Sequence, residues 1–392
     1  MGFFCSCGTE MLTTCHIRIN IRAKNGRFEA SLSRERQPTS INVLLGVNAE
    51  TLYDLSRNLT QNLVRAVRVG KKERLNIQDR ELMDKEFHKI AEHGYDALTE
   101  IFGQKGLKLL KELQGEATRV ILQVISSEFM FPWELLYEDY ERDRLQYENF
   151  WGFKYIIYRT IIPHDGQDIL NKSEIETTPL LVGLLADRSL PKVATVEIPF
   201  FRELERKEFI RLFSLSRSLD PSRRSELLDA DLRQFLGQKL DIIHFACHAR
   251  DSIPEQNEPN NEICLLLSKD FPLWAKDFHI SKLIFGNRPL VILNACCTTH
   301  RDPRRTRSMV KIMFRYGARG VVTTECIIAD TFAAAFSREF YPLLLEGQEL
   351  GDALLNTRMK LRAPPHHNPL GLLYGLYASP YTRFIGLNGG GI

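Results

Sequence analysis

A histidine and a cysteine follow two apolar runs of this sequence, and together they could perform nucleophilic chemistry. His248 comes after the apolar run 240–247, and Cys296 comes after the run 289–295. A thiolate attacks a carbonyl carbon, whereas a thiol barely does, and a nearby imidazole can accept the thiol proton or protonate a leaving amine. Two backbone N–H groups at the strand ends could hold the oxyanion that develops.

Other histidines and cysteines compete for these roles. His244 lies four residues before His248, on the same strand face, where a core or supporting histidine is the better interpretation. Cys297 directly follows Cys296, and because strand side chains alternate, at most one of the two faces His248. Strand geometry leaves that choice open. We expect core positions for the remaining cysteines of this region, Cys247, Cys264 and Cys326.

The elements that would position His248 and Cys296 alternate between strands and helices. Several β runs are apolar without alternation, as in parallel strands that are buried on both faces. The β runs are 119–125, 153–160, 180–186, 240–247, 262–267, 289–295 and 319–325. The helix candidates are 200–213, 226–237, 306–316, 331–345 and 349–361. This order predicts an α/β fold with a mostly parallel sheet sandwiched between helices, whose functional groups lie beyond the carboxyl ends of the strands.

The N-terminal part has a different pattern. Residues 16–22 and 27–33 alternate on either side of a turn signal, and apolar spacing predicts helices over 49–69 and from about 77 to 102. We therefore expect a β-meander plus helix extension over residues 1–75 and the main α/β domain over residues 76–392.

Composition excludes several classes of protein. Of 392 residues, 44% are hydrophobic and 26% charged, as in folded proteins, and 52 basic against 49 acidic residues give a net charge of +3. This balance supplies no broad basic field for nucleic acid, and no apolar run is long enough to span a membrane. The cysteines form no ladder of spaced pairs, so a reducing cytoplasm is expected, without a cofactor. The cluster of Cys5, Cys7, Cys15 and His16 lacks the usual zinc spacing, so no metal site is expected.

The motifs around the histidine and the cysteine are similar to those of a known family. His244-Phe-Ala-Cys-His248 and Leu293-Asn-Ala-Cys296-Cys-Thr resemble two blocks of the CHAT family of caspase-like cysteine peptidases, in the clan of caspases, separase and gingipains. The 48 positions from 248 to 296 also match the caspase spacing of about 50. Further similar segments are 131–137, Tyr158-Arg159, 317–324, Asp330 and Phe340-Tyr341.

The resemblance implies roles for individual residues. By position, His248 would be the catalytic histidine, and Cys296, rather than Cys297, the nucleophile. The backbone N–H groups of Cys296 and Ala249 would form the oxyanion hole. The family carries glycine where this chain has Ala249, and glycine accepts a positive φ that alanine disfavours.

Two acidic residues are candidates for substrate binding. Glu325 and Asp330 follow the β run 319–325, near the specificity pocket expected in this clan, where carboxylates would select a basic side chain. Asp330 could instead cap the following helix, and Glu325 could be a solvated strand end. The arginine-rich loop 301–307 could be a solvated loop, a contact for an acidic partner or a site of self-processing.

The resemblance predicts a cysteine endopeptidase that cleaves a partner protein through a Cys-His dyad. Such an enzyme would act in a triggered signalling, antiviral defence or cell-death pathway, with an activating partner chain or sensor. One alternative is a non-catalytic caspase-like module that binds or scaffolds partners, which Ala249 favours. Another is a hydrolase or acyltransferase that acts on a bond other than a peptide bond.

Overall fold

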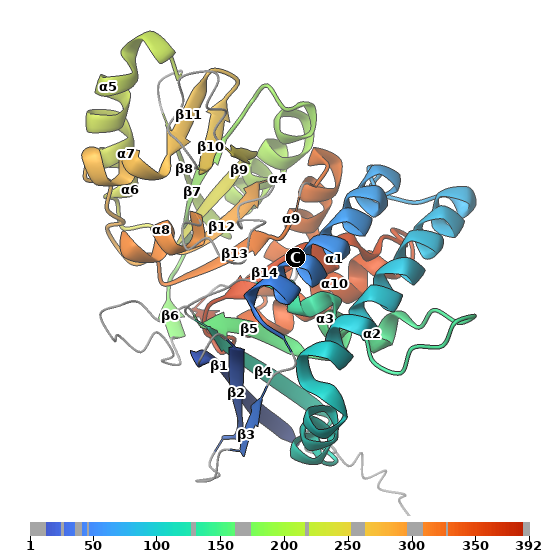
Figure 1. Cartoon of the computed structure of the whole chain (residues 1–392). Coiled ribbons are helices and arrows are strands. Elements are labelled where there is room, and N and C mark those ends of the chain that lie inside the picture. Colours follow the sequence, from blue (N-terminus) through green and yellow to red (C-terminus); the bar gives the residue numbers. More distant parts are fainter. Residues whose placement is uncertain are drawn as a thin grey trace, which may run out of the picture.

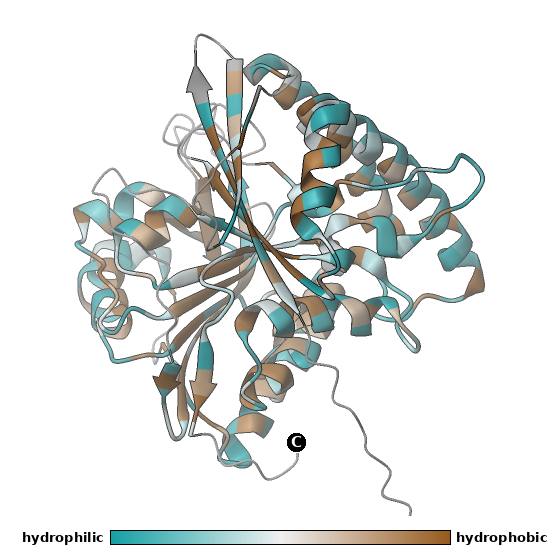
Figure 2. Ribbon diagram, turned by 90° about the horizontal axis from the view of Figure 1, so that it is seen from below, coloured by the Kyte–Doolittle hydropathy of each residue, from teal (hydrophilic) through white to brown (hydrophobic). Residues whose placement is uncertain are grey.

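A computed structural model describes residues 13–24, 27–35, 41–44, 47–126, 131–160, 174–215, 219–251, 263–295, 309–326 and 328–386. Its larger elements are two β-sheets with helices around them (Figure 1). Hydrophobic segments are concentrated in the strands, while the helices alternate between hydrophobic and hydrophilic residues (Figure 2). Within the described ranges, every helix is too short or too polar to span a lipid bilayer.

The smaller sheet has five strands in the order β3-β2-β1-β4-β5. These strands are β1 (Thr14–Lys24), β2 (Arg27–Arg34), β3 (Ile41–Leu44), β4 (Arg119–Ser126) and β5 (Ile156–Thr160). The first three form the expected antiparallel meander, and β1 then pairs in parallel with β4. This sheet therefore combines strands from both sides of residue 75.

The larger sheet has eight strands, and β9 lies at its centre. Its strands are β7 (Leu180–Ala186), β8 (Ile210–Ser214), β9 (Ile242–Asp251), β10 (Ile263–Ser268), β11 (Phe271–Trp274), β12 (Leu290–Ala295), β13 (Gly320–Thr324) and β14 (Tyr374–Tyr377). β8, β7, β9, β12 and β13 run parallel, whereas β14 is antiparallel to β13. The end of β9 pairs with β10 instead of β7. Two short strands, β6 (Glu174–Glu176) and β15 (Arg383–Ile385), pair separately.

Helices cover both faces of the larger sheet, as the alternating sequence pattern predicts (Figure 1). The helices are α1 (Ala49–Val69), α2 (Ile77–Gln114), α3 (Trp151–Lys154), α4 (Ile198–Arg206), α5 (Arg224–Glu226), α6 (Arg233–Leu236), α7 (Ala275–Ile280), α8 (Met309–Arg315), α9 (Asp330–Leu345) and α10 (Leu350–Arg362). One face belongs to a core that includes α4, α9 and α10, and the other to a core that includes α6, α7 and α8.

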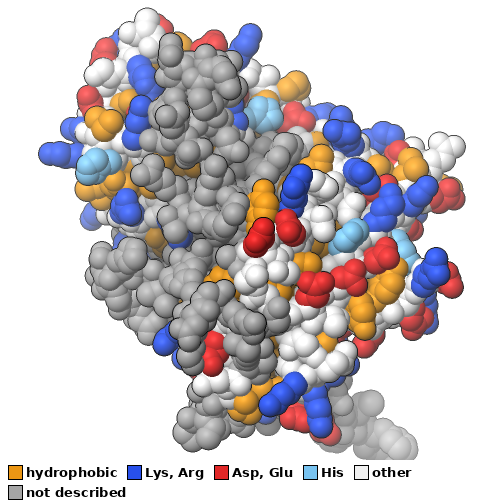
Figure 3. All heavy atoms as spheres, viewed as in Figure 1, with side chains coloured by type: hydrophobic (Ala, Val, Ile, Leu, Met, Phe, Trp, Pro, Cys, Tyr) orange, Lys and Arg blue, Asp and Glu red, His pale blue; other side chains and the backbone are white. Residues whose placement is uncertain are grey.

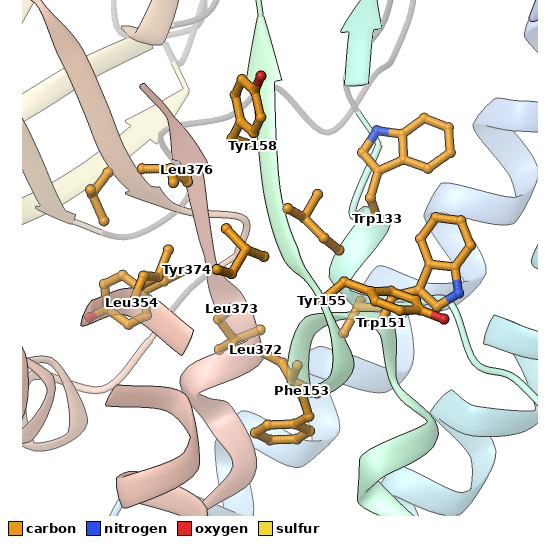
Figure 4. Close-up of a cluster of buried hydrophobic side chains, with 14 of the residues drawn as sticks. Trp133, Trp151, Phe153, Tyr155, Tyr158, Leu354, Leu372, Leu373, Tyr374 and Leu376 are labelled. Carbon is orange, nitrogen blue, oxygen red and sulfur yellow. The ribbon is translucent and has the colours of Figure 1, made fainter. Parts of the chain in front are cut away.

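The two sheets meet where β5 lies beside β14. Figure 4 shows the buried aromatic and aliphatic side chains around these two strands, among them Tyr158 of β5 and Tyr374 of β14. Arg159 of β5 reaches Glu325, which directly follows β13, with 3.4 Å between guanidinium nitrogen and carboxylate oxygen. Gly375 of β14 makes this crossing possible, because a Cβ there would lie only 2.6 Å from the Glu325 carboxylate and 2.8 Å from the Arg159 guanidinium.

Two expectations about secondary structure were wrong. The helix expected over 200–213 ends at Arg206, and Ile210–Ser214 forms β8. Glu208, with a φ of 60°, turns the chain so that β8 can pair with β7. The β runs 119–125 and 153–160 contribute to the smaller sheet and not to the parallel one. An apolar strand pattern shows that a strand is buried, but it does not show which sheet buries it.

The described part of the face shown in Figure 3 carries both positive and negative side chains. The pattern agrees with the near balance of charges in the sequence.

Candidate active site

The carboxyl ends of β9 and β12 lie side by side at one edge of the larger sheet. The two strands are parallel, with Asn294 opposite Ala246 and Ala295 opposite Cys247. The next residue in the sequence is His248 after Cys247, and Cys296 after Ala295. Cys296 and Cys297 lie outside the described residues, as does the arginine-rich loop 301–307.

His248 and Ala249 continue β9 beyond this point. His248 is exposed and pairs with Leu266 of β10, while Ala249 is buried and pairs with Leu265. Ala249 therefore has the extended backbone of a β-strand, which any residue adopts. An alanine in this position carries no strain of the kind that a positive φ would impose.

His244 lies on the same face of β9 as His248, but it is completely buried. Its Nε2 is 2.9 Å from Oε1 of Glu197, and its Nδ1 is 3.0 Å from the hydroxyl of Tyr341. These contacts confirm the interpretation of His244 as a core or supporting histidine. Cys247, Cys264 and Cys326 are buried in the core, as expected.

Glu197 is the centre of a buried polar network below the strand ends. It ends the π-helical turn Val193–Glu197 that leads into α4. Its Oε1 also accepts hydrogen bonds from Asn294 Nδ2 at 2.7 Å and from Ser337 Oγ at 2.6 Å. Burial alone would raise the pKa of Glu197, but the hydrogen bonds from His244, Ser337 and Asn294 outweigh it and hold the pKa below its ordinary value. Glu197 is therefore a carboxylate at neutral pH.

Asn294 and Thr324 complete the polar contacts around β12. The side-chain oxygen of Asn294 accepts a hydrogen bond from the Tyr374 hydroxyl at 2.5 Å, so both ends of its amide are satisfied. The buried hydroxyl of Thr324, on β13, donates to the carbonyl oxygen of Ala295. That carbonyl belongs to the peptide unit whose N–H is that of Cys296.

Sequence comparison identifies the family of the chain. A model of the CHAT domain matches residues 96–382, which is most of the sequence. The chain belongs to the CHAT domain family. The resemblance inferred from the motifs is thereby confirmed. Comparison of this CHAT protein with curated proteins gives no match.

Solved structures of separase resemble this CHAT protein. In a separase–securin complex from Saccharomyces cerevisiae, the similar chain has 12% sequence identity and a TM-score of 0.52, over 95% of this chain and 30% of that one. A second structure of the yeast separase–securin complex has 11% identity and a TM-score of 0.49, over 94% and 30%. The CHAT protein thus spans about 30% of the length of the separase chain. The first similarity shows a shared fold, and it confirms the mixed α/β architecture with a central, mostly parallel sheet.

The two acidic candidates of this CHAT protein lie in different surroundings. Glu325 is almost completely buried, beside Arg159, and accepts a hydrogen bond from the Tyr377 hydroxyl at 3.2 Å. Asp330 is the first residue of α9, and its Oδ2 accepts a hydrogen bond from the backbone N–H of Lys192 at 3.1 Å. It is partly exposed and does not cap its own helix. The specificity pocket stays a prediction, which Asp330 suits better than Glu325.

The supporting residues of this site could not be identified from the sequence. Glu197 has no motif of its own, although Asn294 and Thr324 stand inside segments used for the resemblance. A carboxylate in an amphipathic segment is normally interpreted as solvent-facing, so only the tertiary contacts identify Glu197. Among the described residues, no group of three or more His, Cys, Asp or Glu side chains could hold a metal ion.

Proposed function

We propose that this CHAT protein is a cysteine endopeptidase that cleaves a partner protein with Cys296 as nucleophile and His248 as general acid and base. The register of β9 and β12 carries the proposal. Ala295 of β12 lies opposite Cys247 of β9, and each of these two residues is followed in the sequence by one member of the dyad. Membership in the CHAT family and the separase-like fold support the same chemistry.

The proposed reaction has two steps. His248 accepts the thiol proton of Cys296, the thiolate attacks the scissile carbonyl carbon, and the same histidine then protonates the departing amine. The acyl-enzyme is hydrolysed by a water molecule whose proton passes to His248, and the thiol is restored when the C–S bond breaks. The N–H groups of Cys296 and Ala249 would stabilise the oxyanion in both steps.

The alternative of a non-catalytic scaffold rested on alanine in place of glycine at position 249. Ala249 has a buried, extended conformation in β9, paired with Leu265. This backbone needs no glycine, so the departure from the family pattern does not argue against catalysis. The observation that favoured the scaffold alternative therefore loses its weight.

Substrate and partners form the finer part of the proposal. Asp330, which is partly exposed at the start of α9, would select a basic residue before the scissile bond. An activating partner chain or sensor would trigger cleavage in a signalling, defence or cell-death pathway. A reducing compartment such as the cytoplasm, expected from the cysteine spacing of the sequence, is part of this proposal.

The test compares the purified protein with its Cys296→Ala, Cys297→Ala and His248→Ala variants. All four are incubated with a peptide library and with an alkylating peptide directed at active-site thiols. We expect cleavage and labelling to disappear with Cys296→Ala and to survive Cys297→Ala. Labelling that survives Cys296→Ala and disappears with Cys297→Ala would overturn the assignment of the nucleophile. Binding of peptides without cleavage by any form would favour the scaffold.

A further inference from the structure

Glu197 connects the two strands that carry the proposed dyad, although it belongs to neither. Through one oxygen it binds His244 of β9 at 2.9 Å and Asn294 of β12 at 2.7 Å. His244 comes four residues before His248, and Asn294 comes two residues before Cys296. Even-numbered spacing along a strand keeps side chains on one face, so Glu197 lies under the same sheet face that carries His248.

Hydrogen bonds, and not apolar contacts, join Glu197 to β9 and β12. Glu197, His244 and Asn294 are all buried, and a carboxylate withdrawn from water is costly unless donors surround it. Three donors converge on Oε1 of Glu197, and the third comes from Ser337 of α9. Apolar side chains could fill the same space without this requirement. Hydrogen bonds, unlike apolar contacts, set both the distance and the direction between β9 and β12.

We propose that Glu197 is a positioning residue that holds β9 and β12 at the separation and twist required by the dyad. This inference rests on the proposed function, because it assigns Glu197 a role toward His248 and Cys296. Misplacing reacting groups by about 1 Å can cost about 100-fold in rate. Loss of the carboxylate should therefore lower the reactivity of Cys296 more than it lowers the stability of the fold.

The experiment measures alkylation of Cys296 by iodoacetamide, followed by mass spectrometry of the peptide that contains it. We compare the alkylation rate at pH 7 with the rate at pH 10. Both rates depend on how well iodoacetamide reaches Cys296, but only the rate at pH 7 depends on the fraction of thiolate, because the thiol is ionised at pH 10 in every variant. The ratio of the two rates therefore reports the thiolate fraction. No substrate is needed. Glu197→Gln tests the proposed link between β9 and β12, and Glu203→Gln, which changes a partly exposed carboxylate on α4, is the matched control. Ser337→Ala removes the donor that belongs to neither catalytic strand.

We expect Glu197→Gln to lower the ratio about tenfold, while Glu203→Gln and Ser337→Ala stay near the wild-type value. A Glu197→Gln ratio equal to that of Glu203→Gln would overturn the proposal. So would an equal loss with Ser337→Ala, because the network would then be general support for the fold. The His248→Ala variant distinguishes failure of the proposed dyad from failure of the proposed role of Glu197. If that variant leaves the ratio unchanged, the dyad itself fails, whereas a fall with His248→Ala alone refutes only the role of Glu197.

A variant that does not fold is detected by circular dichroism. In that case Tyr341→Phe replaces Glu197→Gln, because it removes the hydroxyl at Nδ1 of the same His244 ring and keeps the edge-to-face contact with the Phe201 ring. We expect a fall in the alkylation ratio of about threefold, smaller because Glu197 still holds Nε2. An unchanged ratio in folded Tyr341→Phe would then count against the positioning role.

Discussion

Replacement of Arg159 by methionine should strongly destabilise this CHAT protein. The Arg159 guanidinium is buried between the two sheets and donates to both carboxylate oxygens of Glu134, once at 2.9 Å, and to the Phe131 carbonyl at 3.1 Å. It also lies 3.4 Å from the Glu325 carboxylate. Burial alone would lower the pKa of Arg159, but the charge of Glu134 outweighs it and raises the pKa. Arg159 is therefore the cation that neutralises both carboxylates.

The size of the stability loss depends on the contacts that Glu134 and Glu325 keep once Arg159 is replaced. Without Arg159, Glu134 keeps Arg358, with 3.3 Å between nitrogen and oxygen, and the charge of Arg358 also acts on Glu325. Glu325 loses its direct contact with the Arg159 guanidinium and keeps the hydrogen bond from the Tyr377 hydroxyl. Removing one partner of a buried ion pair costs about 3–5 kcal/mol, because the other charge is left uncompensated. Retention of Arg358 argues against the upper limit, and the weakened compensation of two carboxylates at once argues against the lower one. We expect a loss of about 4 kcal/mol in the free energy of unfolding.

Urea unfolding, followed by far-UV circular dichroism, measures this loss. With a slope of about 2 kcal/mol per molar urea, the midpoint should fall by about 2 M. The matched control is Arg206→Met, an exposed arginine paired with Glu203, which should cost at most about 1 kcal/mol. Arg159→Met combined with Glu325→Gln should lose less than the sum of the single losses, because the second change removes one of the carboxylate charges that Arg159 compensates. If Arg159→Met loses no more than Arg206→Met, the inference that this ion pair joins the sheets is refuted.

Three further predictions concern the site and its surroundings. Thr324→Val removes the donor to the Ala295 carbonyl and so loosens the peptide unit that carries the Cys296 N–H; we expect kcat to fall about tenfold at unchanged KM, with recovery in Thr324→Ser, since loss of a whole oxyanion donor costs about 100-fold or more. Asp330→Asn should reduce the preference for a basic residue before the scissile bond in a peptide library, and an unchanged preference would exclude the carboxylate from the pocket. Burial holds the pKa of His16 below its ordinary 6.5, so the unfolded chain takes up the proton first as the pH falls, and stability present above 6.5 is lost on acidification. His16→Gln should therefore lose less of its urea midpoint than the wild type between about pH 7 and pH 5.

Much of the fold could be predicted from the sequence, because periodicity reports burial directly. The helix expected over 49–69 is α1, and the asparagine before it, Asn48, accepts hydrogen bonds from the N–H groups of Glu50 and Thr51. The assignment of strands to sheets could not be predicted. β1 pairs with β4 across about a hundred residues, and local sequence carries no signal for a pairing at that distance.

The candidate site could be predicted only in part, for a related reason. His248 follows a strand and stands in a motif, so position and residue type both identify it. Its supports come from separate parts of the chain, since Glu197 lies 47 residues before His244 and 140 residues before Ser337. Glu197 also lies in a π-helical turn, whose geometry no apolar spacing predicts. The fold brings these side chains together, and their spacing in sequence does not.

The polar residues inside β9 and β12 contribute to the geometry of this sheet edge more than to the stability of the fold. His244 and Asn294 occupy core positions where apolar residues would be no less stable, because buried polar groups contribute little net free energy even when they are fully paired. Their hydrogen bonds to Glu197 restrict the strands to one arrangement, whereas apolar cores tolerate small shifts with modest changes in free energy. This restriction matters where two strands must hold reacting groups within about 3.5 Å of each other. The buried network lies directly beneath the ends of the two strands that lead to His248 and Cys296, which is where that restriction would serve catalysis.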